Sequence, residues 1–532
     1  MDEFDYVVIG AGSAGCAVAG RLSEDPSKRV LLLEAGAKDR HYWLHIPVGY
    51  FKTPWDERFS WCFETEPEPG TNNRRMPWPR GKVLGGSSAI NGLVYIRGQA
   101  ADYDHWRQLG NVGWAWDDVL PYFKRSEDQQ RGADDLHGTG GPLAVQDLRM
   151  QHPICEAFVA AAEEIGIPRN DDFNGPDQEG VGYYQLTTRN GLRCSSAKAY
   201  LGPAKGRGNL EVRTDALVER IELDGRRATG VTFRRGGRSE TVRARGEVIL
   251  SAGAIGSPHI LQLSGIGPGG ALQKAGIAVN HELPGVGENL EDHLQVRMYY
   301  RANQPVTLND TLKTWWGRLS VGAEYVFKRA GPMSIGAGQV GIFTRSRPHV
   351  EAPDIQFHIF PVSFDRPGLG LKGLHPFSGF TSSVCLLRPQ SRGRVMAKSA
   401  DPARHPGIWP NFLDAIEDQE TIIGGVRVAR RLAEAPSLAR YVDKEMSIGA
   451  EAQTDAEILE KARELGATIF HPACTCRMGP DEMAVVDDQL RVHGIEGLRI
   501  ADAAAMPALV SGNTNAPAIM IGEKAADLVK AA

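Results

Sequence analysis

Residues 6–36 read YVVIGAGSAGCAVAGRLSEDPSKRVLLLEAG, and this stretch decides the fold. It begins with a continuous apolar run at 6–9, which is typical of a parallel strand buried on both faces. A G-x-G-x-x-G turn follows at 10–15, then a small-residue segment that we expect to be helical over 16–22, then a second apolar run at 29–34. The pattern predicts strand, glycine turn, helix and parallel strand, which is a βαβ unit.

The spacing inside this unit indicates a dinucleotide site. Gly10 is expected to make the tight turn, Gly12 to allow a pyrophosphate to approach, and Gly15 to let the helix pack on the sheet. The helix N-terminus would face the negative charge. Glu34 follows Gly15 by nineteen residues, which suits an acid that accepts hydrogen bonds from a ribose and disfavours a 2′-phosphate. The alternatives are an ordinary glycine turn and a solvated strand-end glutamate.

Other segments extend the same domain. Residues 81–95 read GKVLGGSSAINGLVY, a second glycine-rich loop whose backbone amides suit phosphates, although a flexible turn is the alternative. The stretch before it, 35–80, lacks periodicity and is expected to be an extended covering segment. Further elements are expected as antiparallel strands at 212–223 and 229–233 with a turn at 223–226, a strand and helix start at 247–258, a strand at 498–502 and a helix at about 516–530.

The region from about 300 to 455 changes character. It contains alternating stretches such as IQFHIF at 355–360, bulky aromatic residues such as Trp315 and Trp316, and long polar connections. This pattern predicts a second domain, built on a sheet, that caps the first one.

The composition excludes several classes of protein. The 532 residues carry 60 Lys and Arg against 65 Asp and Glu, a formal charge of −5, which argues against a dedicated nucleic-acid binder. The acidic N-terminus does not resemble a signal peptide, and no apolar run of 18 residues predicts an integral membrane segment. Seven cysteines favour a reduced compartment, so we expect a cytoplasmic protein, with docking at the inner face of the membrane as the alternative. Cys474 and Cys476 form one C-x-C pair, too weak a signal to predict a metal.

Four motifs carry a resemblance to a known family. They are GAGSAG at 10–15 with EAG at 34–36, GKVLGGSSAIN at 81–91, SAGAIGSPHILQLSGIG at 251–267, and HPACTCRMG at 471–479 with GLRIAD at 497–502. In this order they resemble the glucose-methanol-choline (GMC) family of FAD-dependent oxidoreductases. The resemblance implies an α/β fold with a Rossmann-like FAD-binding domain over 1–155, 191–300 and 460–532. It also implies a discontinuous second α+β domain, built on an antiparallel sheet over 156–190 and 301–459, that covers the substrate.

The resemblance also implies the cofactor site. Asn91 and Val94 are expected nearest the flavin ring, Val218 behind the adenine, and Asp502 at the ribityl chain. Some relatives attach FAD covalently through a histidine, but the matching position here is Ile90, so we expect non-covalent FAD. The full set of expected FAD-binding residues is Gly10, Gly12, Ser13, Ala14, Gly15, Glu34, Ala35, Gly85, Ser87, Asn91, Gly92, Val94, Val218, Ala252, Asp502, Ala503, Asn513 and Thr514.

Two residues match the family's catalytic positions. Alcohol oxidation needs a base for the hydroxyl proton while hydride leaves to the flavin, and imidazole has a suitable pKa. His471 matches the catalytic histidine of the family. The partner position, which is histidine in some relatives, is Asn513 here; an amide cannot be a base, so it is expected to donate a hydrogen bond to the substrate oxygen.

The expected substrate pocket rests on weaker signals. His358 matches a position that lines the site of choline oxidisers, with a packed strand histidine as the alternative. Gln339 aligns with a glutamate that pairs the trimethylammonium group in those relatives, and a neutral amide cannot balance a buried cation. Trp315 and Phe357, with Trp316 and Phe360, are expected to form an aromatic entrance, although such residues at strand spacing are more often core.

These observations give three hypotheses of function. The first is FAD-dependent oxidation of a neutral primary alcohol to the aldehyde, with the proton taken by His471. The second is choline oxidation, and the third is a lyase of the same family that keeps FAD as structure. The electron acceptor is O₂ or a quinone or carrier, and the oligomeric state stays open.

Overall fold

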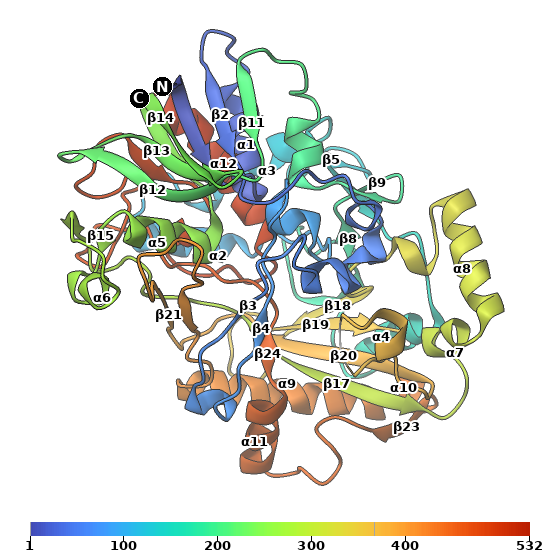
Figure 1. Ribbon diagram of the computed structural model, residues 1–532. Coiled ribbons are helices and arrows are strands. Elements are labelled where there is room, and N and C mark those ends of the chain that lie inside the picture. The colour runs from blue at the N-terminus through green and yellow to red at the C-terminus, as the bar shows by residue number, and fades with distance from the viewer. Residues whose placement is uncertain (1, 366–367) are drawn as a thin grey trace.

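The computed structural model describes residues 2–365 and 368–532, and its first sheet lies in the upper part of Figure 1. In this sheet β1, β2, β11, β14 and β25 run parallel, while β12 and β13 pair antiparallel beside β14. The strand order is β11-β2-β1-β14-β13-β12, with β25 also beside β14. The strands are β1 (Glu3–Ile9), β2 (Val30–Leu33), β11 (Leu210–Arg213), β12 (Leu217–Asp224), β13 (Arg227–Arg235), β14 (Arg238–Leu250) and β25 (Leu498–Ile500).

The expected βαβ unit is present, since β1 and β2 pair in parallel around helix α1 (Ser13–Leu22). The expected single strand at 212–223 is instead two strands. The chain leaves β11 at Thr214, and the backbone N–H of Ala216 donates to the carbonyl of Glu34 before β12 begins. The left-handed φ of 58° at Asp215 makes this break, which periodicity alone does not reveal.

The second sheet is antiparallel throughout. Its order is β23-β17-β20-β19-β18-β7, with β24 also beside β17. The strands are β7 (Gly180–Tyr183), β17 (Leu294–Ala302), β18 (Val340–Thr344), β19 (Ile355–Phe360), β20 (Gly379–Leu386), β23 (Val442–Glu445) and β24 (Ala467–Thr468). The expected domain boundary at residue 300 falls inside β17, and the whole of that strand belongs to this sheet.

Helices cover both sheets. Helix α9 lies below the second sheet in Figure 1, and α8 stands at the edge of the molecule. No helix within residues 2–365 and 368–532 has the length and apolar character needed to cross a bilayer. The remaining helices are α2 (Ala100–Gln108), α3 (Trp116–Ser126), α4 (Pro153–Glu164), α5 (Gly253–Leu263), α6 (Gly269–Lys274), α7 (Leu308–Lys313), α8 (Trp315–Lys328), α9 (Ile416–Glu434), α10 (Pro436–Ala439), α11 (Asp455–Leu465) and α12 (Asn515–Lys530).

The expected covering segment at 35–80 contains short 3-10 helices, turns and one small ladder, β3 (Phe63–Glu64) with β4 (Pro77–Trp78). Such segments run over the surface because they lack a periodic apolar face of their own. The other short strands are β5 (Glu127–Gln129), β6 (Leu143–Asp147), β8 (Gln185–Leu186), β9 (Thr188–Arg189), β10 (Leu192–Arg193), β15 (Ile266–Gly267), β16 (His281–Glu282), β21 (Arg394–Met396) and β22 (Gly407–Trp409).

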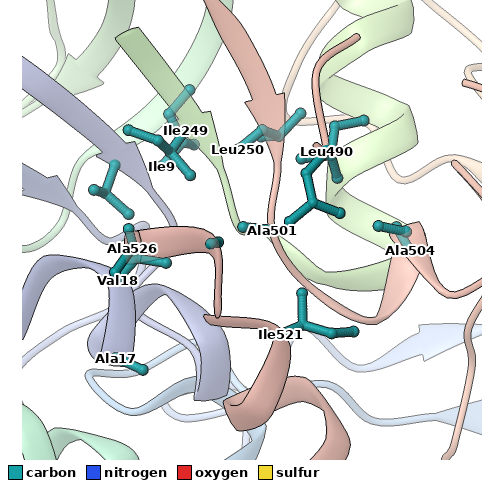
Figure 2. Close-up of a cluster of buried hydrophobic side chains, with 14 of the residues drawn as sticks. Ile9, Ala17, Val18, Ile249, Leu250, Leu490, Ala501, Ala504, Ile521 and Ala526 are labelled. Carbon is teal, nitrogen blue, oxygen red and sulfur yellow. The ribbon is translucent and has the colours of Figure 1, made fainter. Parts of the chain in front are cut away.

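The core of the first domain lies between its sheet and the helices α1 and α12, as Figure 2 shows. Ile9 and Leu250 point from the strands toward Val18 of α1 and Ile521 of α12, and all four are buried. Each such side chain contributes about 1.5–3 kcal/mol when removed from water. This core fixes the carboxyl ends of β1 and β14, which is where the functional site lies.

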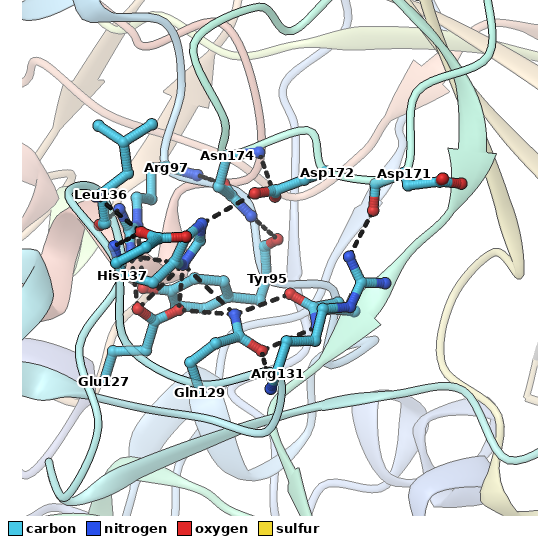
Figure 3. A network of polar contacts seen from close by, with 12 residues as sticks. Tyr95, Arg97, Glu127, Gln129, Arg131, Leu136, His137, Asp171, Asp172 and Asn174 are labelled. Atoms are coloured by element: carbon cyan, nitrogen blue, oxygen red, sulfur yellow. Dashed lines mark hydrogen bonds and ion pairs between the residues drawn. The ribbon is translucent and has the colours of Figure 1, made fainter.

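A buried polar network fastens the chain just after the second glycine loop (Figure 3). The guanidinium of Arg97 pairs with Glu127 at 2.7 Å, and neither side chain is exposed. His137 lies 3.2 Å from Glu127 and 2.9 Å from Asp172. Burial opposes the charged imidazole, but the hydrogen bonds to Asp172 and Glu127 prevail and raise the pKa of His137 to about 9.

Candidate active site

Two cavities meet at the carboxyl end of the first sheet. The first encloses about 1190 Å³ of non-atom space between the glycine turn, the end of β2 and the start of α5. The second encloses about 1280 Å³ between the second glycine loop and the second sheet. They share the lining residues Ser13, Arg80, Ser87, Ala503 and Ala518, so the two cavities are adjacent. Open α/β sheets bind ligands at this edge.

The first glycine turn has the geometry that a dinucleotide needs. Gly10 has a φ of +96°, which glycine adopts without strain. A Cβ on Gly15 would lie 1.9 Å from the carbonyl oxygen of Gly10, so α1 can pack this closely only with glycine there. A Cβ on Gly12 would meet nothing nearer than 3.9 Å, and Gly12 lines the first cavity. The turn is therefore closely packed at Gly15, on the side of α1, and open at Gly12, on the side of the first cavity.

Glu34 presents a fixed carboxylate at the end of β2. Its Oε2 accepts from the backbone N–H of Ala11 at 3.0 Å, and its Oε1 from that of Gly36 at 2.8 Å. Burial raises the pKa of Glu34 to about 7 although these bonds act against the rise. A carboxylate has about four acceptor positions, so both oxygens can still accept from ribose hydroxyls.

Asp502 follows β25 and lines the first cavity. Its Oδ2 accepts from the backbone N–H of Gly253 at 2.8 Å and from the hydroxyl of Ser257 at 2.6 Å, while Oδ1 accepts from the N–H of Ala504 at 2.7 Å. The carboxylate therefore ties the start of α5 to the loop after β25. Most of its acceptor capacity serves the protein, and a single position is left for a ligand.

The second glycine loop presents an amide to the second cavity. The side-chain oxygen Oδ1 of Asn91 accepts from Nη1 of Arg193 at 2.7 Å and from the backbone N–H of Leu93 at 3.2 Å. Burial lowers the pKa of Arg193 to about 9. With its oxygen engaged on both sides, Asn91 lines the cavity with its NH₂ group free to donate.

Most of the residues expected to bind FAD line one of the two cavities. The glycine cradle, the fixed carboxylate and the free amide donor fit a dinucleotide cofactor of the size of these cavities. Gly15 and Gly85 line neither cavity, and the backbone N–H of Gly85 instead donates to the carbonyl of Ala11 at 2.8 Å. The remaining members line the first or second cavity: Gly10, Gly12, Ser13, Ala14, Glu34, Ala35, Ser87, Asn91, Gly92, Val94, Val218, Ala252, Asp502, Ala503, Asn513 and Thr514.

His471 and Asn513 are in contact at the wall of the second cavity. Asn513 Nδ2 lies 3.1 Å from His471 Nε2. Asn513 is oriented by Gln356, whose Nε2 donates to its Oδ1 at 3.2 Å. The amide of Asn513 therefore donates to the imidazole rather than accepting from it.

The other nitrogen of His471 is fixed by a second histidine. His293 Nδ1 lies 3.1 Å from His471 Nδ1, and His293 Nε2 lies 3.1 Å from the carbonyl oxygen of Leu387. Because a carbonyl only accepts, His293 carries its proton on Nε2 and its Nδ1 accepts. His471 must then carry its proton on Nδ1. The network assigns the lone pair to Nε2 of His471, on the side of Asn513.

The surroundings keep His471 neutral. Burial is the main cause that lowers the pKa of His471 well below the ordinary histidine value, and the nearby His293 and Arg80 act in the same direction. The backbone is held by Asp292, whose Oδ1 accepts from the N–H of His471 at 2.7 Å. Arg80 donates from Nη1 to the carbonyl of Phe470 at 2.7 Å, which also fixes this loop.

Three of the four expected substrate-pocket residues do not line the second cavity. His358 does line the second cavity. Phe357, the preceding residue of β19, points to the opposite face of the sheet and is buried in its core, because successive side chains of a strand alternate. Gln339 is also buried outside the cavity, where its Oε1 accepts from the thiol of Cys155 at 3.1 Å. Trp315 lies on the exposed face of α8 and contributes nothing to the cavity wall.

Several lining residues were missed by the sequence analysis. Arg80 and Arg297 bring two guanidinium groups to the second cavity, and among the described residues no aspartate or glutamate lines it. His293 and Gln356 act through contacts across the sheet. The available signal was the alternation along β17, which places Gln295 and Arg297 on one face; His293 directly precedes this strand. In the described part of the chain no group of three or more His, Cys, Asp or Glu side chains could hold a metal.

Comparisons with known proteins agree with this architecture. Residues 4–295 match the N-terminal GMC oxidoreductase domain, and residues 389–522 match the C-terminal one. The chain is 45% identical to an oxygen-dependent choline dehydrogenase of Pectobacterium carotovorum over 99% of this chain and 95% of the relative.

Solved structures give the same result. Pyridoxine 4-oxidase from Mesorbium loti superposes with a TM-score of 0.89 at 30% identity over 98% of both chains. A formate oxidase from Aspergillus oryzae superposes with a TM-score of 0.92 at 27% identity, over 100% of this chain and 98% of the other. With matching domains over most of its length, this chain belongs to the GMC oxidoreductase family of FAD-dependent alcohol oxidoreductases.

Proposed function

We propose that this enzyme oxidises a primary alcohol that carries no positive charge to the aldehyde, with His471 as the base. The observation that carries the proposal is the directional hydrogen-bond chain from Leu387 through His293 to His471. It leaves the lone pair of Nε2 at the wall of the second cavity, beside the donor amide of Asn513. A base and a hydrogen-bond donor at one point are what the deprotonation of an alcohol requires.

The two cavities have different proposed roles, one in binding the cofactor and the other in binding the substrate. Bound FAD supplies the hydride acceptor. We assign its dinucleotide part to the first cavity, where Gly12 is open and Glu34 is fixed, and the substrate to the second cavity, beneath the second sheet. Ile90 lines the second cavity, and its aliphatic side chain offers no atom for a covalent bond to the ring. The described domains thus separate cofactor binding from substrate covering.

The substrate hydroxyl is placed between His471 Nε2 and Asn513 Nδ2, where it replaces their mutual hydrogen bond. His471 is neutral at pH 7 because its pKa is lowered, so Nε2 is ready to accept the hydroxyl proton. Asn513 then donates to the oxygen as negative charge develops. Gln356 holds the amide in this orientation while the proton moves.

Choline is the second candidate substrate, because the curated relatives are choline dehydrogenases. The charge of the second cavity opposes it. The described lining residues include two arginines and no carboxylate, so a buried trimethylammonium group would meet two like charges and no compensating acid. Aromatic rings also line this cavity, and their attraction for the cation would have to outweigh both guanidinium groups. A lyase is the third candidate, and it predicts a flavin that no alcohol reduces.

An anaerobic titration of the purified holoenzyme tests the proposal. Neutral primary alcohols are expected to bleach the flavin absorbance, while choline at the same concentration is not. His471→Ala should slow the bleaching about 10²- to 10⁴-fold, the usual contribution of a general base. His349→Ala, an exposed histidine, is the matched control and should behave as wild type.

Each other outcome has a definite meaning. Bleaching by choline alone would establish the choline hypothesis instead. A flavin that no alcohol bleaches would favour the lyase. Full activity in His471→Ala would refute the assignment of the base. Admission of air then separates an oxidase, which recovers its colour quickly, from a dehydrogenase.

A further inference from the structure

The far end of the second cavity is an aromatic chamber with one cation in it. Tyr50, Phe51, Phe360 and Phe364 form its walls, and Arg297 reaches it from β17. The rings of Phe51 and Phe364 meet edge to face at 5.3 Å. The guanidinium of Arg297 stands 5.5 Å from the centre of the Phe364 ring. Charge and apolar surface therefore lie side by side.

The strand places Arg297 in line with the catalytic pair. Side chains at alternate positions of β17 share a face, so Gln295 and Arg297 face the cavity while the residues between and beside them are core. His293 directly precedes β17 and is buried behind the cavity wall. His293 contacts His471. Arg297 lies four positions after His293, which is about 13 Å along an extended chain. A substrate held by both His471 and Arg297 must therefore have several atoms between its two ends.

Arg297 has no acidic partner in the described part of the chain. Burial is the main cause that lowers its pKa, and the one titratable neighbour that acts against this is Tyr50. The hydroxyl of Tyr50 is itself buried without a hydrogen-bond partner. A buried hydroxyl without a partner is costly, and native proteins rarely keep one without a reason. The unpartnered hydroxyl of Tyr50 and the guanidinium of Arg297 thus line the same cavity.

We propose that Arg297 and Tyr50 bind a carboxylate at the far end of the alcohol substrate. This inference rests on the proposed alcohol oxidation and extends its substrates from neutral alcohols to hydroxy acids with an apolar spacer. The guanidinium fork matches a carboxylate with two parallel hydrogen bonds, and the phenol donates a third. The aromatic walls contact the spacer, and a cationic head group is repelled by Arg297.

Binding of carboxylates that cannot be oxidised tests the site without turnover. Benzoate and hexanoate are titrated into the holoenzyme by calorimetry, each against its primary amide. We expect the acids to bind at least tenfold more tightly than the amides. Arg297→Met should abolish this preference, and Arg297→Lys should keep part of it. Arg301→Met is the matched control, since Arg301 lies on the same strand but is exposed and pairs with Asp443.

The outcomes are decisive. Equal affinity of wild type for acid and amide, or an unchanged preference in Arg297→Met, overturns the proposal. If Arg297→Met does not fold, Tyr50→Phe takes its place as the test. It should weaken acid binding several-fold and leave amide binding unchanged. If Tyr50→Phe binds the acids as tightly as wild type does, the proposal is overturned. Tighter binding of choline than of the carboxylates would overturn it too.

Turnover experiments distinguish the proposed carboxylate site from the proposed alcohol oxidation. A series of ω-hydroxy acids is compared with plain primary alcohols of equal length, and the acids should show a KM at least tenfold lower in wild type and not in Arg297→Met. If carboxylates bind but no alcohol bleaches the flavin, the proposed oxidation fails while the carboxylate site stands. If alcohols bleach the flavin without any preference for acids, the oxidation stands and the site fails.

A separate observation concerns helix α8, which stands at the edge of the molecule in Figure 1. Its buried side holds Val321 and Tyr325. The outer side exposes one continuous apolar stripe whose members are between 56% and 85% exposed: Trp315, Trp316, Leu319, Val326 and Phe327. A surface helix normally turns such a stripe toward the core.

The charges around this stripe are mainly basic. Lys313, Arg318, Lys328 and Arg329 are exposed, against the single acid Glu324, in a chain whose net charge is −5. Trp and Phe on one face with Lys and Arg beside them are the pattern of helices that lie in a membrane interface. Anionic lipid head groups complement the basic residues.

We infer that the outer face of α8 docks on a bilayer that contains anionic lipid. The full holoenzyme is expected to sediment with phosphatidylglycerol-containing vesicles, less at high salt, and not with phosphatidylcholine alone. A Trp315→Ser, Trp316→Ser, Phe327→Ser variant should lose this binding and keep its activity. Ile416→Ser, which removes an exposed residue of α9, is the control.

Three results would overturn this second inference. Wild type that does not sediment with anionic vesicles contradicts it, and so does a triple variant that sediments as well as wild type. A third is dimerisation through this face, seen as a wild-type dimer that the triple variant breaks while vesicles bind neither protein.

Discussion

Replacing His293 should impair the enzyme although this residue does not face the substrate hydroxyl. His293 accepts from Nδ1–H of His471 at 3.1 Å and is itself anchored on the carbonyl of Leu387. In His293→Leu that acceptor is lost inside a buried site. His471 can then move its proton to Nε2, which removes the lone pair that the alcohol needs.

The size of the effect follows from the cost of the lost bond. A buried donor left without a partner costs about 1–3 kcal/mol, and this is the penalty for keeping His471 in the productive tautomer. At tenfold per 1.36 kcal/mol, the rate should fall roughly 5- to 150-fold. His293→Asn retains an acceptor oxygen near the position of Nδ1, so it should recover most of the rate.

The assay is the anaerobic rate of flavin reduction at saturating alcohol, measured by stopped flow. A purely structural role for His293 would lower the rate and the melting temperature in both variants alike. The tautomer argument predicts instead that Leu and Asn differ in rate at similar stability. Wild-type rates in His293→Leu, or an Asn variant as slow as the Leu variant, would refute the reasoning.

The remaining predictions concern the cofactor and stability. In Gly12→Ala the new Cβ would enter the open cavity, so this variant should fold but lose FAD on gel filtration. In Gly15→Ala the new Cβ would lie 1.9 Å from a carbonyl oxygen, so this variant should not yield folded protein, as circular dichroism would show. Acid precipitation should release all the yellow colour into the supernatant, since Ile90 cannot hold FAD covalently; colour in the pellet would contradict this. The pKa of His137 is raised to about 9, so its charge stabilises the fold fully below about pH 6.5 and this stability is lost as the pH rises through 9. Melting temperature should therefore drop more steeply between pH 7 and 9.5 in wild type than in His137→Gln.

Local sequence signals were enough for the cofactor half of the fold. The βαβ unit, the glycine turn and the acid at residue 34 are read within about thirty residues, and each has a local physical reason. Gly10, Gly12 and Glu34 all line the first cavity, and their contact with FAD stays a prediction. The break at Asp215 was missed because a single left-handed residue leaves no trace in hydrophobic periodicity.

The substrate half was harder because it depends on register between distant strands. Phe357 and His358 are neighbours in sequence, yet one is core and the other lines the cavity, and a shift of one residue exchanges them. Trp315 looked like a pocket aromatic only because its helix could not be placed by sequence. The signals for Gln339 failed in the same way, since an ungapped alignment carries no information about which face a side chain takes.

The charge of the second cavity disfavours choline for a different reason from the one that the sequence suggested. The sequence-based reason was the neutrality of Gln339, but that side chain is bonded to Cys155 and lies outside the cavity. The charge that matters sits on β17, where Arg297 occupies the cavity-facing position four residues after His293. The identity to choline dehydrogenases is a property of the whole chain, whereas the proposed exclusion of a cationic substrate rests on the cavity-facing guanidinium groups of Arg80 and Arg297. Substrate preference in this family member is therefore better judged from the electrostatics of the cavity than from the identity of the whole chain.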